Sequence, residues 1–262
     1  MDSYLESKTI KVGENDIHYL TGGNGKPLVV VHGGGGGSTA WLRTAAELSD
    51  YYRVYVPDLP GFGKSKSEKE KFDLSDFVAF IEDFSKSLGL DDFHLVGHSI
   101  GGCIALLYAL EFPHRPSKLV LISSMCLGKE IALWIRFLSR SAFQKSFGEA
   151  AIAFFTAIKW LGRRLNAPFR FNSPLSRLKI DIGRSTTTLK GQATIVANQL
   201  SELVMPTLLI WGADDKIIPP RHAYAAAEVI PDCQVNVLDG GGHHVHTQKT
   251  AEFSEIMTSF LG

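Results

Sequence analysis

The chain has 262 residues, enough for one large domain with a sizeable hydrophobic core. Apolar residues make up 45% of it and charged residues 21%, which excludes a disordered or fibrous protein. The formal net charge is zero, which argues against a dedicated nucleic-acid binder. The polar start of the chain argues against a signal peptide. The lack of a long uncharged apolar stretch argues against a membrane span.

The three cysteines, Cys103, Cys126 and Cys233, are few, odd in number and scattered along the chain. Such usage is typical of buried thiols in a reducing compartment and not of a disulfide framework. Together with the lack of a predicted signal peptide, it predicts a cytoplasmic protein.

In chain order, short apolar runs alternate with stretches of helical spacing. A hairpin opens the chain, and the fully apolar run 28–31 predicts a strand buried on both faces. The predicted strands are 9–12, 17–20, 28–31, 54–56, 93–97, 119–122, 207–211 and 234–238, and the predicted helices are 41–48, 77–88, 100–111, 222–229 and 251–261. Asp73 or Ser75 is the predicted N-cap of the helix 77–88. This alternation predicts an α/β protein whose mostly parallel sheet is covered by helices on both faces.

Residues 125–200 break this rhythm and predict several helices without a clear buried strand. An insertion after the sixth strand would lie over the carboxyl ends of the strands, where ligands bind in open α/β folds. We therefore predict a core domain formed by residues 1–124 and 201–262 and a helical cap formed by residues 125–200.

The predicted cap is basic, with 12 Lys/Arg against 3 Asp/Glu, whereas the remainder has 15 against 24. The simpler interpretation is a solvated charged surface that attracts the acidic core. The alternatives are docking at an anionic membrane surface and an anionic substrate. For the substrate, Arg136, Arg140 and Arg184 are the candidate binding residues.

A candidate nucleophile lies in the segment Gly97-His98-Ser99-Ile100-Gly101, between a predicted strand and a predicted helix. The G-x-S-x-G motif requires this context, because the tight turn raises the serine hydroxyl above the sheet at a helix N-terminus. Glycines flank the serine because a Cβ there would collide with neighbouring backbone. Ser99 is therefore the predicted nucleophile.

A serine hydroxyl needs a general base and an acid that orients the base, in the chain order Ser, Asp/Glu, His. Asp214 and Asp215 follow the predicted strand 207–211, and His243 follows the strand 234–238. Both loops open at the same edge of the sheet as Ser99. The spacing alone leaves the choice between the two aspartates open.

With these motifs, the chain resembles the α/β-hydrolase superfamily over nearly its whole length except the predicted cap. In that family the acid precedes two aliphatic residues and a proline, as in Asp215-Lys216-Ile217-Ile218-Pro219, which favours Asp215 over Asp214. The base follows a glycine, which identifies His243. The resemblance then places His244 towards the acyl pocket or solvent and gives His246 a structural role.

The resemblance also implies an oxyanion hole. His32-Gly33-Gly34 follows a predicted strand, and the family's donors would be the backbone amides of Gly34 and Ile100. Five consecutive glycines leave the register open, so Gly35 is an alternative that would contact substrate. His32 is predicted to hold this loop.

Phosphate and metal binding are weaker interpretations. Gly63-Lys64-Ser65 matches the end of a P-loop, but Asp58 stands where its first glycine belongs. Asp58 is therefore predicted to be structural. His243, His244 and His246 lack the spacing of a known zinc motif, so neither a metal nor a cofactor is expected.

The predicted function is hydrolysis of a small-molecule ester through an acyl-enzyme. The alternative is hydrolysis of a carbon–carbon bond in a dienoate, because the glycine-rich loop resembles that of meta-cleavage-product hydrolases. Those enzymes commonly carry Trp after the catalytic histidine, where this chain has His244. A ligand receptor without turnover is a third possibility, since the fold does not determine function. Whether the protein is a monomer or a homodimer is left open.

Overall fold

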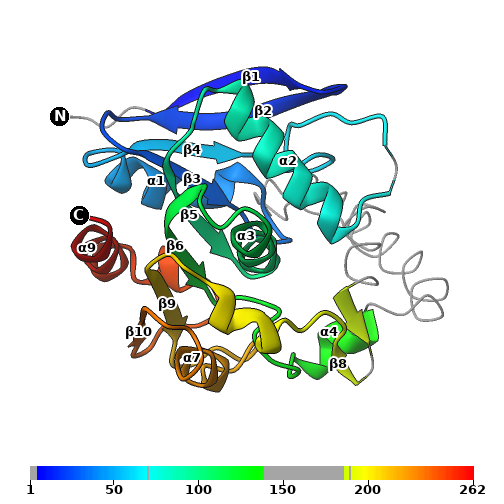
Figure 1. Cartoon of the computed structure of the whole chain (residues 1–262), viewed down its shortest axis with the longest axis vertical. Coiled ribbons are helices and arrows are strands. Elements are labelled where there is room, and N and C mark those ends of the chain that lie inside the picture. Colours follow the sequence, from blue (N-terminus) through cyan, green and yellow to red (C-terminus); the bar gives the residue numbers. More distant parts are fainter. Residues whose placement is uncertain (1–4, 70, 139–185, 189) are drawn as a thin grey trace, which may run out of the picture.

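The computed structural model describes residues 5–69, 71–138, 186–188 and 190–262 (Figure 1). An eight-stranded sheet forms its centre, in the order β1-β2-β4-β3-β5-β6-β9-β10. The strands are β1 (Glu6–Val12), β2 (Asn15–Gly22), β3 (Pro27–Val31), β4 (Arg53–Pro57), β5 (Phe93–His98), β6 (Pro116–Ile122), β9 (Thr207–Gly212) and β10 (Cys233–Leu238). Strand β2 is antiparallel to both of its neighbours and all other pairs in this sheet are parallel, as predicted.

Helices cover both faces of the sheet (Figure 1). On one face lie α2 (Leu74–Ser87), α3 (Ile100–Glu111) and α7 (Arg221–Ala227), and on the other lie α1 (Leu42–Leu48), α8 (Val245–Gln248) and α9 (Thr250–Leu261). Strand β3 shows why its apolar run is continuous. Val29 and Val31 pack into the first core, whereas Leu28 and Val30 pack into the second.

Helix α2 has Asp73, one of its two predicted N-cap residues, as its N-cap. The side chain of Asp73 accepts a hydrogen bond from the amide of Asp76, and the Asp76 side chain accepts one from the amide of Asp73. This reciprocal capping satisfies two amides that the first helical turn leaves without partners. The helix therefore extends back to Leu74, although its buried aromatic face begins only at Phe77.

The described parts of the predicted cap contain two elements that the sequence pattern did not reveal. Strands β7 (Thr187–Thr188) and β8 (Gly191–Gln192) form a separate antiparallel hairpin. The short helix α4 (Leu133–Leu138) precedes it, and the 3-10 helix η2 (Ala197–Glu202) follows it. Residues 139–185 lie outside the described part of the chain, so the extent of the cap stays a prediction.

The expectation of free thiols is wrong for two of the three cysteines. Cys103 and Cys126 form a disulfide with their Cα atoms 5.4 Å apart, and both are buried. The two residues meet because the first turn of α3 and the loop after β6 converge on one carbonyl. The backbone carbonyl oxygen of Ser99 accepts hydrogen bonds from the amides of Cys103 (3.2 Å) and Met125 (3.0 Å). Spacing in the sequence does not reveal this convergence. Cys233 is free.

Within the described ranges, no helix is both long and apolar enough to cross a lipid bilayer.

Candidate active site

Ser99 lies at the turn between β5 and α3 with a φ of 56°, a left-handed conformation that L residues rarely adopt. The amide of Ser99 donates to the Ile122 carbonyl at 2.9 Å, which holds the turn against β6. A Cβ on Gly97 would overlap the Gly101 carbonyl, and a Cβ on Gly101 would overlap the Val31 carbonyl. The flanking glycines are therefore required sterically, and the strained serine is held rigidly above the sheet.

Three side chains from separate loops meet at this turn. The Oγ of Ser99 lies 3.0 Å from Nε2 of His243, and Nδ1 of His243 lies 2.9 Å from Oδ2 of Asp215. Asp215 follows β9, and His243 follows β10. Parallel strands end at the same edge of the sheet, which brings the three residues together as their positions in the chain predict.

The carboxylate of Asp215 is fully buried and held from two sides. Its Oδ1 accepts hydrogen bonds from the amides of Ile217 (2.8 Å) and Ile218 (3.0 Å), while Oδ2 faces His243. Burial alone would raise the pKa of Asp215. The hydrogen bond and charge of His243 and the two amides outweigh it and lower the pKa below its ordinary value. The neighbouring Asp214 is exposed.

The predicted oxyanion donors lie beside each other. A Cβ on Gly34 would lie 3.8 Å from Cγ2 of Ile100, whereas a Cβ on Gly35 would meet nothing within 4 Å. Among the described residues, no hydrogen-bond acceptor contacts the amide of Gly34 or that of Ile100. Both amides are thus available to a ligand, and the choice between Gly34 and Gly35 as donor stays a prediction.

Two buried polar side chains support the glycine loop. The Nδ1–H of His32 donates to the Gly33 carbonyl at 2.7 Å, and its Nε2 accepts from the Leu59 amide at 3.0 Å. The carboxylate of Asp58 accepts from the amides of Ser38 and Lys64. These contacts agree with the structural roles predicted for His32 and Asp58.

We expect Asp58→Asn to lower the free energy of unfolding by about 2–3 kcal/mol at pH 7. The reason is that the NH₂ group of Asn would point at the Lys64 N–H, so that two hydrogen-bond donors would oppose each other without an acceptor. Burial would raise the pKa of Asp58, but the Lys64 and Ser38 amides outweigh it and lower the pKa below 3.8. The ionised carboxylate therefore stabilises the fold above about pH 4, and this contribution disappears as the pH falls through the folded-state pKa.

Urea unfolding at pH 7 and pH 3 measures this effect. The exposed Asp50→Asn is the matched control, with an expected change within about 0.5 kcal/mol. The difference between Asp58→Asn and the wild type should shrink at pH 3. Equal stability of the two variants at pH 7 would contradict the structural role.

Sequence reasoning missed His98, the residue before the nucleophile. Its side chain is buried, and its Nε2–H donates to the backbone carbonyl of His243 at 2.8 Å. The imidazole therefore fixes the main chain of the candidate base. The signal in the sequence was an ionisable residue next to the candidate nucleophile, at the end of a strand that is otherwise apolar or glycine from Leu95 to Gly97.

The remaining predicted site residues are only partly placed by the structure. His244 is exposed, and its ring centroid lies 5.4 Å from that of His243. The Nε–H of Arg136 in α4 donates to the Ile131 carbonyl at 2.8 Å. Arg140 and Arg184 lie outside the described residues, so their proposed role in substrate binding stays a prediction.

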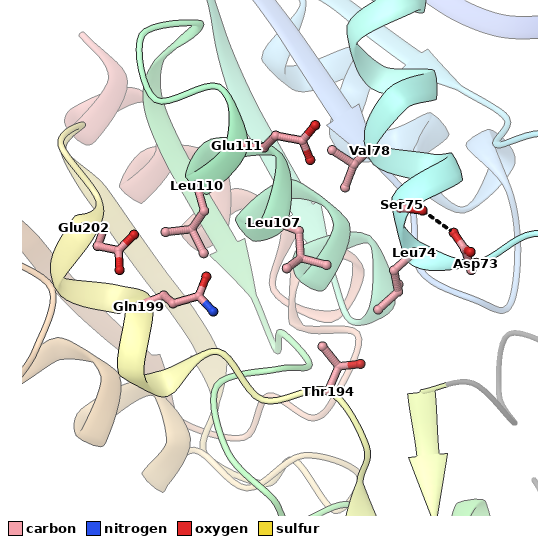
Figure 2. Close-up of a pocket in the computed structure, with 10 residues that line it drawn as sticks. All are labelled: Asp73, Leu74, Ser75, Val78, Leu107, Leu110, Glu111, Thr194, Gln199 and Glu202. Atoms are coloured by element: carbon pink, nitrogen blue, oxygen red, sulfur yellow. Dashed lines mark hydrogen bonds between the residues drawn. The ribbon is translucent and has the colours of Figure 1, made fainter.

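A groove of about 550 Å³ opens between the start of α2, the second half of α3 and residues 194–202 (Figure 2). Asp73, Leu107 and Glu202 are among its lining residues, and none of the lining residues belongs to the triad or the candidate oxyanion hole. Leu107 lies eight residues beyond Ser99, about 12 Å along α3. The groove is therefore separate from the candidate chemistry.

A mostly parallel eight-stranded sheet with a strand–serine–helix turn defines a hydrolase of the α/β class. A family model for the α/β hydrolase fold matches residues 26–250, and the chain belongs to that family.

Three similar proteins illustrate the range of the family. The chain is 29% identical to 2-hydroxy-6-oxo-6-phenylhexa-2,4-dienoate hydrolase of Burkholderia cepacia, over 94% of this chain and 91% of that protein. The structure of the hydrolase of the same name from Rhodococcus sp. strain RHA1 matches with a TM-score of 0.78 and 20% identity over 99% of both chains. A carboxylesterase structure from Bacillus subtilis matches with a TM-score of 0.73 and 22% identity, over 98% of this chain and 92% of that one. The two structural likenesses show the fold.

Proposed function

We propose that the protein is a serine hydrolase that cleaves a small-molecule carboxylic ester or a related acyl bond. One observation carries the proposal, the continuous series of hydrogen bonds from Ser99 Oγ through His243 to the buried carboxylate of Asp215, at 3.0 and 2.9 Å. A hydroxyl, an imidazole and a buried carboxylate in this order form the arrangement that activates a serine for attack on a carbonyl.

In the first step the Ser99 oxygen attacks the substrate carbonyl while Nε2 of His243 takes its proton. Asp215 accepts the Nδ1–H of His243, which keeps Nε2 unprotonated before attack and stabilises the imidazolium afterwards. The tetrahedral intermediate then collapses to an acyl-enzyme. His243 returns the proton to the leaving oxygen, and the alcohol departs.

The amides of Gly34 and Ile100 donate to the oxyanion of the tetrahedral intermediate. Removal of one such donor typically costs about 2.7–4 kcal/mol of transition-state stabilisation. The Ile100 amide also lies at the N-terminus of α3, where the partial positive charge of the helix favours the developing negative charge.

In the second step a water molecule attacks the acyl-enzyme. His243 accepts the proton of the water, and the carboxylic acid leaves as Ser99 recovers its proton. These steps need no group besides the three side chains and the two amides.

Carbon–carbon bond hydrolysis of a dienoate is the second candidate function. It is supported by the 29% identity to the dienoate hydrolase of Burkholderia cepacia over nearly the full length of both chains. The same serine, histidine and oxyanion donors would serve that reaction. His244 counts against it, since the meta-cleavage-product group commonly carries Trp at this position.

Turnover of p-nitrophenyl esters, from acetate to long acyl chains, tests the proposal directly. Release of p-nitrophenol above the uncatalysed rate is expected, and the chain-length optimum measures the acyl pocket. In a parallel assay, 2-hydroxy-6-oxo-6-phenylhexa-2,4-dienoate is followed by loss of its absorbance. Turnover of the dienoate alone would replace the ester proposal with the second candidate. The absence of turnover in both assays would favour a ligand receptor.

An anionic substrate is supported by the excess of Lys and Arg between residues 125 and 200. Half-esters of dicarboxylic acids compared with neutral esters of equal length test this part of the proposal. A lower KM for the half-esters at equal kcat supports it, because uniform binding energy lowers KM alone. Equal KM values would contradict it.

A further inference from the structure

Three histidines gather beside the triad without belonging to it. His98 ends β5, His244 precedes α8, and His246 lies within α8. One ring nitrogen from each lies within 4.8 Å of the others. The ring centroids of His244 and His246 are 5.1 Å and 4.5 Å from that of His98. The catalytic steps derived above use none of these three imidazoles directly.

The buried side chain of His246 lacks hydrogen-bond partners among the described residues. The residue is 1% exposed, and neither of its ring nitrogens has a hydrogen-bond partner among the described residues. Its ring is stacked on Trp41 with centroids 4.3 Å apart, and Phe253 lies at 6.3 Å. A neutral imidazole carries one donor and one acceptor, and leaving both buried without partners destabilises the fold. An aromatic hydrocarbon would fill this space without that cost.

We propose that His98, His244 and His246 together bind one divalent transition-metal ion, of the class of Zn²⁺, Ni²⁺ or Cu²⁺. Three imidazole nitrogens select these cations and not Mg²⁺ or Ca²⁺, which prefer oxygen ligands. A tetrahedral zinc site with bonds of about 2.0–2.1 Å holds its nitrogens roughly 3.3–3.4 Å apart. The three ring nitrogens lie within 4.8 Å of one another, so the rings would close around the ion. The exposed His244 gives the ion a path from solvent. The Nε2–H of His98 donates to the His243 carbonyl, so Nδ1 is the His98 nitrogen with a lone pair for the ion.

The protonation of the cluster suits metal binding. Burial, followed by the charges of His244 and His243, lowers the pKa of His246 to about 3. Burial also holds the pKa of His98 well below its ordinary value and lowers that of His244. The three rings are therefore neutral at pH 7, and a neutral imidazole is the form that ligates a metal.

An occupied site would inhibit hydrolysis. The His98 ring centroid lies 5.0 Å from that of His243, and His98 also holds the His243 main chain. An ion that draws the His98 and His244 rings together would shift the main chain of His243, and with it the 3.0 Å contact between His243 and Ser99. The geometry therefore assigns to this cluster the role of an inhibitory metal site in the proposed hydrolase.

Isothermal titration of the full chain with ZnCl₂ tests the site without reference to activity. The wild type is expected to bind one ion per chain, and His244→Gln and His246→Phe should each weaken the affinity at least about tenfold. His246→Phe should keep or raise the melting temperature in the absence of zinc, because it removes a buried unpaired polar group. His114→Gln, an exposed histidine in another loop, is the matched control and should leave the affinity unchanged.

Ester turnover supplies the second readout. Zinc should slow ester turnover by the wild type, with half-maximal inhibition at the dissociation constant measured by titration. In His244→Gln, the zinc concentration for half-maximal inhibition should rise by the same factor as the dissociation constant. Absence of one-to-one zinc binding, or affinity that both ligand variants leave unchanged, would overturn the proposal. If the chain binds zinc as expected but hydrolyses no ester, the metal site stands and the proposed function fails.

Discussion

Ser99→Ala is expected to lower kcat of ester hydrolysis by about 10⁴–10⁶-fold, because it removes the atom that forms the acyl-enzyme. The residual rate would come from the two amide donors and substrate binding alone. The substitution keeps the Cβ, so the strained turn at φ 56° and the amide contact to Ile122 are retained. The melting temperature should therefore stay close to that of the wild type, which separates loss of chemistry from loss of fold.

Ser87→Ala is the matched control. Ser87 is exposed on α2, and its hydroxyl donates only to the Asp83 carbonyl within the same helix. Its kcat/KM should remain within about twofold of the wild type, as for other surface substitutions. Mass spectrometry after reaction with a fluorophosphonate should find the adduct on Ser99 in the wild type and in Ser87→Ala. Full ester turnover by Ser99→Ala would refute the serine mechanism.

The fold was predictable because parallel sheets impose a strong pattern. Strand β3 lies between two cores, so each of its residues from Leu28 to Val31 has to be apolar. Helix α3 was predicted with its observed bounds, because the tight turn at Ser99 sets its beginning. The start of helix α2 was predictable from its N-cap candidate Asp73, although the buried aromatic face begins only at Phe77.

The triad was predictable for a topological reason. Loops that follow parallel strands open at one edge of the sheet, so a serine, an aspartate and a histidine after three such strands are expected to approach one another. Distances of 3.0 and 2.9 Å between their polar atoms agree with that expectation. The choice of Asp215 over Asp214 came from the family resemblance and not from spacing. The structure places the carboxylate of Asp215, and not of Asp214, against His243.

The features that the sequence did not reveal depend on contacts between distant segments. The Cys103–Cys126 disulfide forms where the first turn of α3 and the loop after β6 share the Ser99 backbone carbonyl. The histidine cluster joins β5 to α8, which lie far apart in the chain, and it matches no short metal-binding motif. Local periodicity carries no information about such tertiary proximity.

Asp215→Asn is expected to lower kcat by about 10⁴-fold. The Asn side chain can still accept the amides of Ile217 and Ile218 at the Oδ1 position, so the loop should keep its shape. Its NH₂ group would then donate to Nδ1 of His243, which forces the other tautomer and places a proton on Nε2. A protonated Nε2 has no lone pair for the Ser99 proton, and general-base catalysis is lost.

Asp214→Asn provides the control one residue away. Asp214 is exposed and its described hydrogen bond runs from its amide to the Gly241 carbonyl, so its carboxylate does not support His243. Its kcat should remain within about twofold of the wild type. An equal loss in the two variants would point to a general effect of charge in the loop after β9. A larger loss in Asp214→Asn would move the role of the acid to the neighbouring residue. Only a selective loss in Asp215→Asn fits a buried carboxylate that acts through the tautomer of the base.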